Sequence, residues 1–318
     1  MKHLLTAILL LAFAHTAAGE KNVSLDRDFG TLHGTLLTPD AGAETVAVII
    51  AGSGPIPRNG SVNNYLYLAQ ALEKAGIASL RYDKRGIGAS QFTEPEKMAD
   101  ATFEDFIGDA AAWADYLAGE GFRRVVLVGH SEGALIALCA AQQTPKVAAV
   151  VSLAGAGYPL DEILQLQLAA QLLPDNMDLL LQANAITAAL KRGERVESCP
   201  PQLEALFHPS VQTFWISSLR YDPREEIRKV RVPILVVGGD NDLQVPSGNA
   251  EALAKAQPRA RKAIIAGMTH PLKKCTGRTR IDQMGAYGDR PRPRGRRYGI
   301  HPGSLNFPCR KDKTGLFF

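Results

Sequence analysis

A short apolar run that breaks into a glycine-flanked serine constrains this chain more than any other segment. Residues 125–128 read Val-Val-Leu-Val, residues 129–133 read Gly-His-Ser-Glu-Gly, and residues 134–138 read Ala-Leu-Ile-Ala-Leu. The pattern predicts a strand, a sharp turn and a helix, in which glycines beside the serine relieve the crowding of a strained backbone. We therefore expect the hydroxyl of Ser131 to project at the end of the strand.

This arrangement predicts a nucleophile elbow with Gly129 and Gly133 as its two glycines. A bare Gly-x-Ser-x-Gly also occurs by chance, and it is the preceding strand and the following small-residue helix that make the motif specific here. A serine hydroxyl is a weak nucleophile at neutral pH, so the interpretation requires a histidine base and an acid. In this topology they follow in the order Ser, Asp or Glu, His.

Both partners have candidates downstream of the serine. The strand-like run 232–239 leads into a polar loop that holds Asp240 and Asp242, either of which can be the acid; we assign Asp242. The alternative for each aspartate is a turn former or a helix N-cap, since Asp is favoured in both places. After one more helix, the apolar run 263–266 precedes Gly-Met-Thr-His, which makes His270 the base.

Three other histidines suit other places in the molecule. His208 precedes a proline in a helical region and His301 lies in an irregular tail, so we expect both at the surface. His130, beside the serine, is expected to pack against a neighbouring strand. None of the three is assigned a catalytic role.

A reacting carbonyl also needs donors for the negative charge that develops on its oxygen. The elbow supplies one, the backbone N–H of Glu132. The second is expected from the loop after the strand-like run 46–51, which reads Gly-Ser-Gly-Pro; we assign the N–H of Ser53, with Gly54 as the next candidate. The alternative for this loop is an ordinary glycine turn.

Strand and helix patterns alternate along most of the chain. Strand-like runs are 46–51, 77–82, 124–128, 147–153, 232–237 and 262–266, and helical patterns are 65–74, 103–118, 134–143 and 249–256. The alternation predicts an α/β fold with a mostly parallel sheet and helices on both faces. Residues 23–29 and 31–38 alternate apolar and polar residues and predict an antiparallel edge hairpin.

The alternation stops between Leu153 and Val232. Three helical segments rich in Leu, Gln and Ala replace it, at 159–173, 176–190 and 201–218. We expect a helical lid that roofs the serine and lines an acyl pocket. The alternative is that the leucines serve to pack the lid on the body.

Five spaced motifs together resemble one family. They are the elbow, Ala-Gly-Ser-Gly-Pro at 51–55 with Arg-Asn-Gly at 58–60, Tyr-Asp-Lys-Arg-Gly-Ile-Gly-Ala-Ser at 82–90, Gly-Asp-Asn-Asp-Leu-Gln-Val-Pro at 239–246, and Gly-Met-Thr-His at 267–270. From about residue 29 to 273 the chain resembles α/β-hydrolases of the carboxylesterase and serine-aminopeptidase-like group. The resemblance implies a triad of Ser131, Asp242 and His270, and a structural role for the turn at 83–86.

The triad and the resemblance together predict a serine hydrolase that forms an acyl-enzyme. The resemblance implies a small-molecule acyl ester as substrate, with a short to medium acyl chain. A thioester, a peptide with a free amino end, or acyl transfer to an alcohol are alternatives, because a fold does not fix its substrate. From another class, the alternative is a catalytically silent binding protein, disfavoured because every triad position is filled.

The first nineteen residues are set aside from the fold. Lys2 and His3 precede the apolar run 4–14, and small residues at 16–19 suit cleavage, which predicts a secretory signal peptide. The run is too short to span a bilayer. We expect an exported chain, periplasmic or secreted, with no stable membrane insertion after cleavage; an uncleaved anchor is the alternative.

The mature chain is expected to contain one core and one insertion. The α/β-hydrolase core is predicted at 20–157 and 222–274, and the lid at 158–221. With 46% hydrophobic residues, the chain has ample material for one large domain. Four cysteines are too few for a disulfide scaffold, although Cys275 and Cys309 can pair in an oxidising compartment. No metal-ligand spacing occurs, and no cofactor is expected. The sequence does not indicate an oligomeric state.

The last segment, residues 275–318, has a different character. From Pro271 to Phe318 there are twelve Lys or Arg and three Asp, a net charge of +9. Since the whole chain carries +4 and Lys2 adds +1, residues 20–270 have a net charge of −6. Its mixture of Pro, Gly and Arg predicts an irregular basic tail. Here the chain departs from the family that it resembles, whose similar members continue past the histidine into a closing helix. We favour an altered reading frame or gene end, and a basic arm that contacts nucleic acid or anionic envelope polymers is the alternative. No nucleic-acid partner is expected, because few aromatics lie among the arginines.

Overall fold

The computed structural model describes residues 19–277. The predicted signal peptide up to residue 18, His301, Cys309 and the basic tail from residue 278 lie outside the described residues. The described chain begins directly in the first strand of a sheet and ends close to the loop that carries Asp242.

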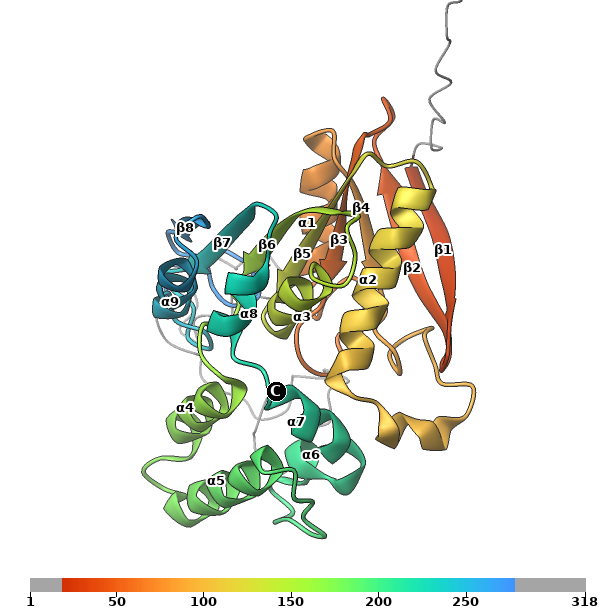
Figure 1. Cartoon of the computed structure of the whole chain (residues 1–318). Helices are drawn as coiled ribbons and strands as arrows, with labels where there is room; N and C mark the ends of the chain where they lie inside the picture. Colours follow the sequence, from red (N-terminus) through yellow and green to blue (C-terminus); the bar gives the residue numbers. More distant parts are fainter. Residues whose placement is uncertain (1–18, 278–318) are drawn as a thin grey trace, which may run out of the picture.

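Eight strands form one sheet in the order β1-β2-β4-β3-β5-β6-β7-β8 (Figure 1). The strands are β1 (Gly19–Arg27), β2 (Gly30–Thr38), β3 (Thr45–Ile50), β4 (Ala78–Tyr82), β5 (Arg124–His130), β6 (Val147–Leu153), β7 (Ile234–Gly239) and β8 (Arg261–Ile265). β1 and β2 make the predicted antiparallel edge hairpin, and β2 also pairs antiparallel with β4. The other neighbours are parallel, as the alternation of strand and helix patterns predicts.

Helices cover both faces of this sheet. Those of the body are α1 (Asn64–Lys74), α2 (Phe103–Gly119), α3 (Glu132–Ala140), α8 (Pro223–Lys229) and α9 (Gly248–Ala256). β3 shows how its residues divide: Val46, Val48 and Ile50 join the large core under α2, α3, α8 and α9, whereas Ile49 packs with Tyr65 of α1. Because both sides are covered, the central strands are apolar throughout rather than alternating.

The face that carries α1 is less completely covered. On that side Val126, Val151 and Leu235 are half-buried, and Ile265 is 46% exposed. The register places Val126, Val151, Leu235 and Ile265 on this same face. Residues 19–277 therefore leave an apolar strip open beside α1.

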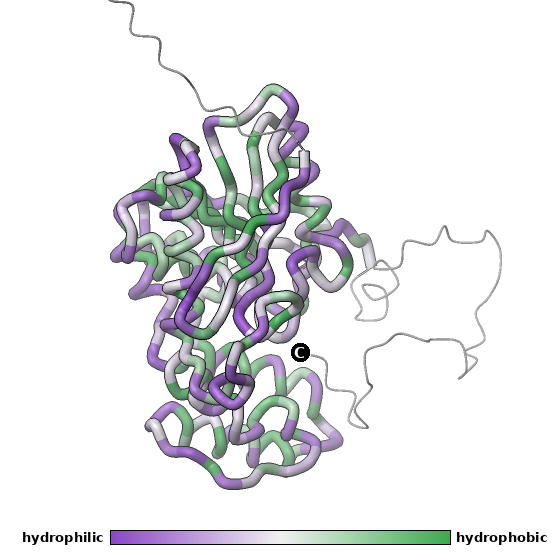
Figure 2. Tube along the Cα trace, turned by 90° about the vertical axis from the view of Figure 1, so that its right-hand side faces the viewer, coloured by the Kyte–Doolittle hydropathy of each residue, from purple (hydrophilic) through white to green (hydrophobic). Residues whose placement is uncertain are grey.

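The segment between β6 and α8 forms a separate helical layer. It consists of α4 (Leu160–Leu172), α5 (Met177–Lys191), α6 (Glu204–Phe207), the 3₁₀ turn η2 (Pro209–Val211) and α7 (Gln212–Ser218). Figures 1 and 2 show this layer below the sheet, and α7 joins it to the body through contacts with the start of α2. Its buried residues form their own apolar cluster, which includes Leu164, Leu168 and Phe207. Most of its leucines therefore pack the layer internally.

Three local predictions need correction. The segment 201–218 is not one helical stretch, because Pro209 follows a break at His208 and opens a short 3₁₀ turn. The sequence analysis did not predict α8 or the 3₁₀ helix η1 (Pro95–Asp100).

Within residues 19–277, no helix has both the length and the apolar character that a bilayer-spanning segment needs.

Candidate active site

Ser131 lies in a tight turn between β5 and α3. Its backbone has φ 55° and ψ −120°, a region that non-glycine residues rarely adopt and that costs on the order of 1–3 kcal/mol. A Cβ on Gly129 would lie 2.0 Å from the carbonyl oxygen of Gly133, and one on Gly133 would lie 2.3 Å from that of Ile50. Both elbow positions therefore require glycine, for packing of the turn on itself and on β3.

The structure brings Ser131, His270 and Asp242 into one hydrogen-bonded line. Nε2 of His270 lies 3.0 Å from Oγ of Ser131, and Nδ1 lies 2.8 Å from Oδ2 of Asp242. The other oxygen of Asp242 accepts the backbone N–H groups of Gln244 and Val245, both at 2.8 Å. Because a carboxylate only accepts, the proton of neutral His270 lies on Nδ1 and the lone pair of Nε2 faces the serine.

Asp240, the other acid candidate, lies elsewhere. It is exposed, and its Oδ1 accepts the backbone N–H of Gly267 at 2.6 Å. It thus ties the end of β7 to the turn before His270. The two aspartates flank Asn241, and their positions in the sequence do not show which one faces the histidine.

The predicted oxyanion donors lie on two loops beside the serine. A Cβ on Gly52 would lie 3.1 Å from Cβ of Ser131, so the loop after β3 passes directly against the nucleophile. Among the residues that the structure describes, no acceptor is recorded for the N–H of Ser53 or of Glu132. The carbonyl of Gly54 instead accepts the N–H of Ile56 in a tight turn. The sequence analysis did not single out Gly52, where a side chain would meet the nucleophile.

A buried histidine joins the elbow to the base. Nε2 of His130 lies 2.8 Å from the carbonyl oxygen of His270, and Nδ1 lies 2.8 Å from the hydroxyl of Tyr65. Burial, with a smaller contribution from His270, lowers the pKa of His130 to about 3, so the ring is neutral. Burial also raises the pKa of Tyr65 to about 12. His130 was expected to pack against a neighbouring strand; its hydrogen bonds go to Tyr65 of α1 and to the loop that carries His270.

The proton positions in this network follow from the carbonyl. A carbonyl oxygen only accepts, so Nε2 of His130 donates to His270 and Nδ1 accepts from the hydroxyl of Tyr65. That hydroxyl in turn accepts the N–H of Gly52 at 3.0 Å. One chain of hydrogen bonds thus connects the loop after β3, helix α1, the end of β5 and the loop that carries His270.

The turn at 83–86 braces the same region. Asp83 accepts hydrogen bonds from the backbone and guanidinium of Arg58 and from the N–H of Ala89. Burial raises the pKa of Asp83, but these bonds outweigh it and hold that pKa below its usual value. Lys84 next to it reaches both Gly52 and Glu132. The resemblance implied a structural role for this turn, and the contacts of Asp83 are of that kind.

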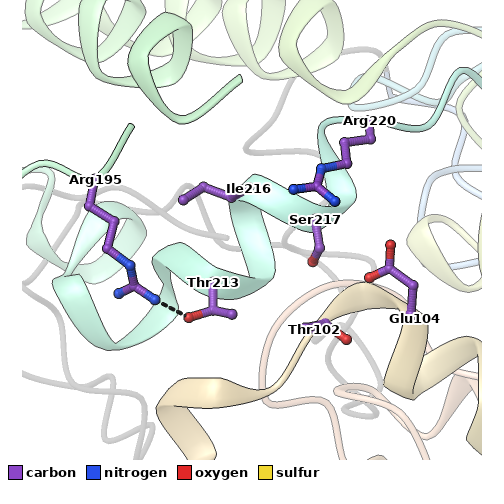
Figure 3. A pocket seen from close by; sticks show the side chains of 7 residues that line it. All are labelled: Thr102, Glu104, Arg195, Thr213, Ile216, Ser217 and Arg220. Carbon is purple, nitrogen blue, oxygen red and sulfur yellow. Dashed lines mark hydrogen bonds between the residues drawn. The ribbon is translucent and has the colours of Figure 1, made fainter. Parts of the chain in front are cut away.

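One cavity lies away from the serine, which is not among the residues that line it. It has a volume of about 440 Å³, and Figure 3 shows it between the start of α2 and α7. It is lined by Thr102, Glu104, Arg195, Thr213, Ile216, Ser217 and Arg220. Arg195 bonds Thr213, and Glu104 accepts from Tyr221 outside the cavity. Residues 19–277 hold no group of three His, Cys, Asp or Glu that suits a metal ion.

Comparison with known proteins places the fold. A model of the family described as serine aminopeptidase S33 (Hydrolase_4) matches residues 47–273. The chain belongs to this family. It is therefore an α/β-hydrolase, and the elbow, the parallel sheet and the order of Ser131, Asp242 and His270 are those of a serine hydrolase of this superfamily. No curated protein matches the chain.

Solved structures with the same fold include esterases and a peptidase. Est1E from Butyrivibrio proteoclasticus, with ferulic acid bound, is 20% identical, covers 79% of this chain and 92% of its own, and has a TM-score of 0.56. A proline iminopeptidase from Mycobacterium smegmatis is 16% identical, with coverage of 79% and 92% and a TM-score of 0.55. The Pyrococcus furiosus esterase Pf2001 is 16% identical, with coverage of 78% and 84% and a TM-score of 0.51. At these identities the similarity shows the fold.

Proposed function

We propose that this hydrolase cleaves carboxylic esters through an acyl-enzyme on Ser131. The observation that carries the proposal is the hydrogen-bonded line from Ser131 through His270 to Asp242. Esterases among the structures with the same fold, one of them with ferulic acid bound, favour an ester substrate. No step requires a cofactor.

The geometry suits a two-step acyl transfer. Oγ of Ser131 attacks the ester carbonyl carbon while Nε2 of His270 takes the hydroxyl proton, and the N–H groups of Ser53 and Glu132 bind the resulting oxyanion. When the intermediate collapses, the ester C–O bond breaks and the leaving alcohol takes that proton. Water then attacks the acyl-enzyme while Nε2 of His270 takes one of its protons. When this second intermediate collapses, the bond to Oγ of Ser131 breaks, His270 gives the proton back to Oγ, and the acid leaves.

Asp242 orients the base in both steps. Its Oδ2 accepts the Nδ1–H of His270, and its Oδ1 is fixed by two backbone N–H groups. The carboxylate thus holds one tautomer and stabilises the imidazolium that forms in each step.

A peptidase that requires a free amino end is the second candidate, because the family description and one structure with this fold name such enzymes. An amino end needs a carboxylate partner in the site. Glu132 is the carboxylate next to the nucleophile, and it pairs with Lys84. This pairing favours the ester over the amino-terminal peptide.

Hydrolysis assays separate the two candidates. p-Nitrophenyl esters of graded acyl length and aminoacyl p-nitroanilides are given to the mature protein, with the Ser131→Ala variant as control. We expect ester turnover that the substitution abolishes, and anilide turnover at least about 100-fold lower. Faster turnover of the anilides would contradict the ester proposal and favour the peptidase.

We further propose that the layer α4–α7 acts as a lid over the site. In support, Nε2 of Gln167 in α4 donates to the carbonyl of Gln244, two residues from Asp242. Leu168, fully buried in the layer, offers a test. Because Leu168 packs inside the layer, Leu168→Ala is expected to loosen the lid and broaden the range of acyl chain lengths that are hydrolysed, whereas Leu166→Ala, at a 67% exposed position on the same helix, leaves that range unchanged.

Export is also a proposal. Residues 1–19 have the composition of a secretory signal, and cleavage after Gly19 would remove only the first residue of β1. Amino-terminal sequencing of the protein from an extracytoplasmic fraction tests this; an intact Met1 on the exported protein would contradict cleavage.

A further inference from the structure

Lys84 places a buried charge between the two loops of the predicted oxyanion hole. Its side chain is only 5% exposed. Nζ lies 2.6 Å from the carbonyl oxygen of Gly52 and 3.0 Å from Oε1 of Glu132, and 5.6 Å from the centre of the Phe106 ring. A lysine is rarely buried without such partners, because removing an ammonium from water costs several kcal/mol.

The contact with Gly52 acts on the peptide unit that carries the first donor. The carbonyl of Gly52 and the N–H of Ser53 belong to the same planar trans peptide, so they point in opposite directions. Fixing the carbonyl on the ammonium therefore fixes the direction of the N–H. The charge also polarises the peptide, which makes that N–H a stronger donor.

The contact with Glu132 acts on the residue that carries the second donor. The carboxylate of Glu132 is also shielded, with a side chain 9% exposed, so the ion pair is little screened by solvent. Glu132 is the first residue of α3, and its N–H is free to face a ligand. The pair thus ties the start of α3 to the loop after β3.

Gly52 is held from its other side as well. Its N–H donates to the hydroxyl of Tyr65 at 3.0 Å. Both peptide units that flank Gly52 are therefore fixed by buried side chains, one neutral and one charged. Of these two, Lys84 alone also contacts the elbow's second donor residue.

We propose that Lys84 is a positioning residue that aligns the N–H groups of Ser53 and Glu132 for the oxyanion. This inference rests on the proposed function. It assigns Lys84 no contact with substrate and no proton transfer. Its effect is expected in the transition state, where the oxygen carries negative charge, and not in binding of the neutral ester.

The Lys84→Met variant tests the alignment. Because deletion of one oxyanion donor lowers kcat by about 10²–10³-fold, misaligning two is expected to lower kcat by about 10- to 100-fold, with KM changed by less than about 3-fold. Binding of butaneboronic acid, which forms a tetrahedral anionic adduct with the serine, is expected to weaken by a similar factor. Lys97→Met, at an exposed lysine that pairs with Glu94, is the matched control and leaves both values unchanged.

A second variant covers the case in which Lys84→Met does not fold, since it leaves the carboxylate of Glu132 buried alone. Lys84→Met combined with Glu132→Gln removes both charges. The same loss of kcat and of boronate affinity is expected, because the carbonyl of Gly52 has lost its partner in both variants. A folded double variant with kcat and boronate affinity within about 3-fold of wild type would overturn the proposal.

The failure of this inference differs from failure of the proposed function. If the wild-type protein neither hydrolyses esters nor binds the boronate, the proposed function has failed. If the wild type does both and a folded Lys84 variant does so equally well, only the role of Lys84 is wrong. A higher KM with unchanged kcat in a folded Lys84 variant would also contradict the positioning role.

Discussion

At the scale of single residues, the site contains two aspartates with different partners. Asp242 bonds Nδ1 of His270, whereas Asp240 bonds the N–H of Gly267. Asp242→Asn would present the wrong tautomer to the serine, so we expect kcat to fall by about 10³–10⁴-fold. Asp240→Asn, the matched control, is expected to lower kcat by less than about 10-fold. The comparison is made by steady-state hydrolysis of one ester, and equal losses would contradict the assignment.

The sequence alone could not make this choice. Both aspartates follow the same strand, both suit a turn, and they are two residues apart. The conformation of the loop decides which aspartate faces His270, because the backbone N–H groups of Gln244 and Val245 donate hydrogen bonds to Asp242. Ser131 and His270, by contrast, were identifiable because each follows a recognisable strand, and the structure brings both together.

His130 gives the fold a dependence on pH. Its pKa is about 3 in the folded protein, against an ordinary value of 6.5, so between these values the unfolded chain binds a proton that the native state does not. The contribution of His130 to stability is therefore fully present above pH 6.5 and is lost, at up to about 1.4 kcal/mol per unit, as the pH drops toward 3.

Urea unfolding between pH 4 and 6 measures this contribution. We expect His130→Gln to remove it and so to make the free energy of unfolding less dependent on pH than in wild type. His208→Gln, at the surface, serves as the control. An unchanged pH slope in His130→Gln would show that the buried ring contributes no such proton linkage.

At the scale of the elements, the elbow depends on how closely α3 packs on β3. Gly133→Ala would place a methyl group 2.3 Å from the carbonyl oxygen of Ile50, which only a shift of the helix can relieve. We expect a loss of at least about 3 kcal/mol in the free energy of unfolding. Gly119→Ala, in helix α2 with no atom within 4 Å of the added carbon, is the matched control and is expected to stabilise by about 0.5–1 kcal/mol. Chemical denaturation measures both; equal stabilities would contradict this account of the packing.

Most elements were predictable because apolar pattern and burial coincide in them. The strands at the centre of the sheet are apolar along most of their length, so each forms a recognisable run even where the α1 side is left open. The helix α8 lacks this signal, because it has only seven residues and begins at a proline. Its outer side carries four charged residues, Arg224, Glu225, Arg228 and Lys229. The break at Pro209 was missed because the residues on both sides of it have helical composition.

At the scale of the whole molecule, the last described residues hold the base loop in place. Asn241 donates to the carbonyls of Cys275 and Gly277, and the N–H of Cys275 donates to Gly267. A chain that stops after Gly277 keeps these bonds, and one that stops after Lys274 loses all three, each worth about 1 kcal/mol. We expect the shorter chain to show at least about 10-fold lower ester turnover and lower stability. Equal turnover would show that the base loop holds itself.

The sequence of the tail after Gly277 does not predict where that segment packs. Its residues carry no apolar period, and the described part leaves an open apolar strip beside α1 on strands β5 to β8. Nothing in a Pro, Gly and Arg mixture predicts what covers such a surface, because packing on a sheet requires a regular apolar face.

The central claim is that His270 and Asp242 activate Ser131 as a nucleophile. Mass spectrometry of the protein after treatment with a fluorophosphonate tests it most directly. We predict one adduct, on the peptide that contains Ser131, formed at least about 100-fold more slowly in the His270→Ala variant and not at all in Ser131→Ala. No adduct on the folded protein, or an adduct that persists in Ser131→Ala, would contradict the claim.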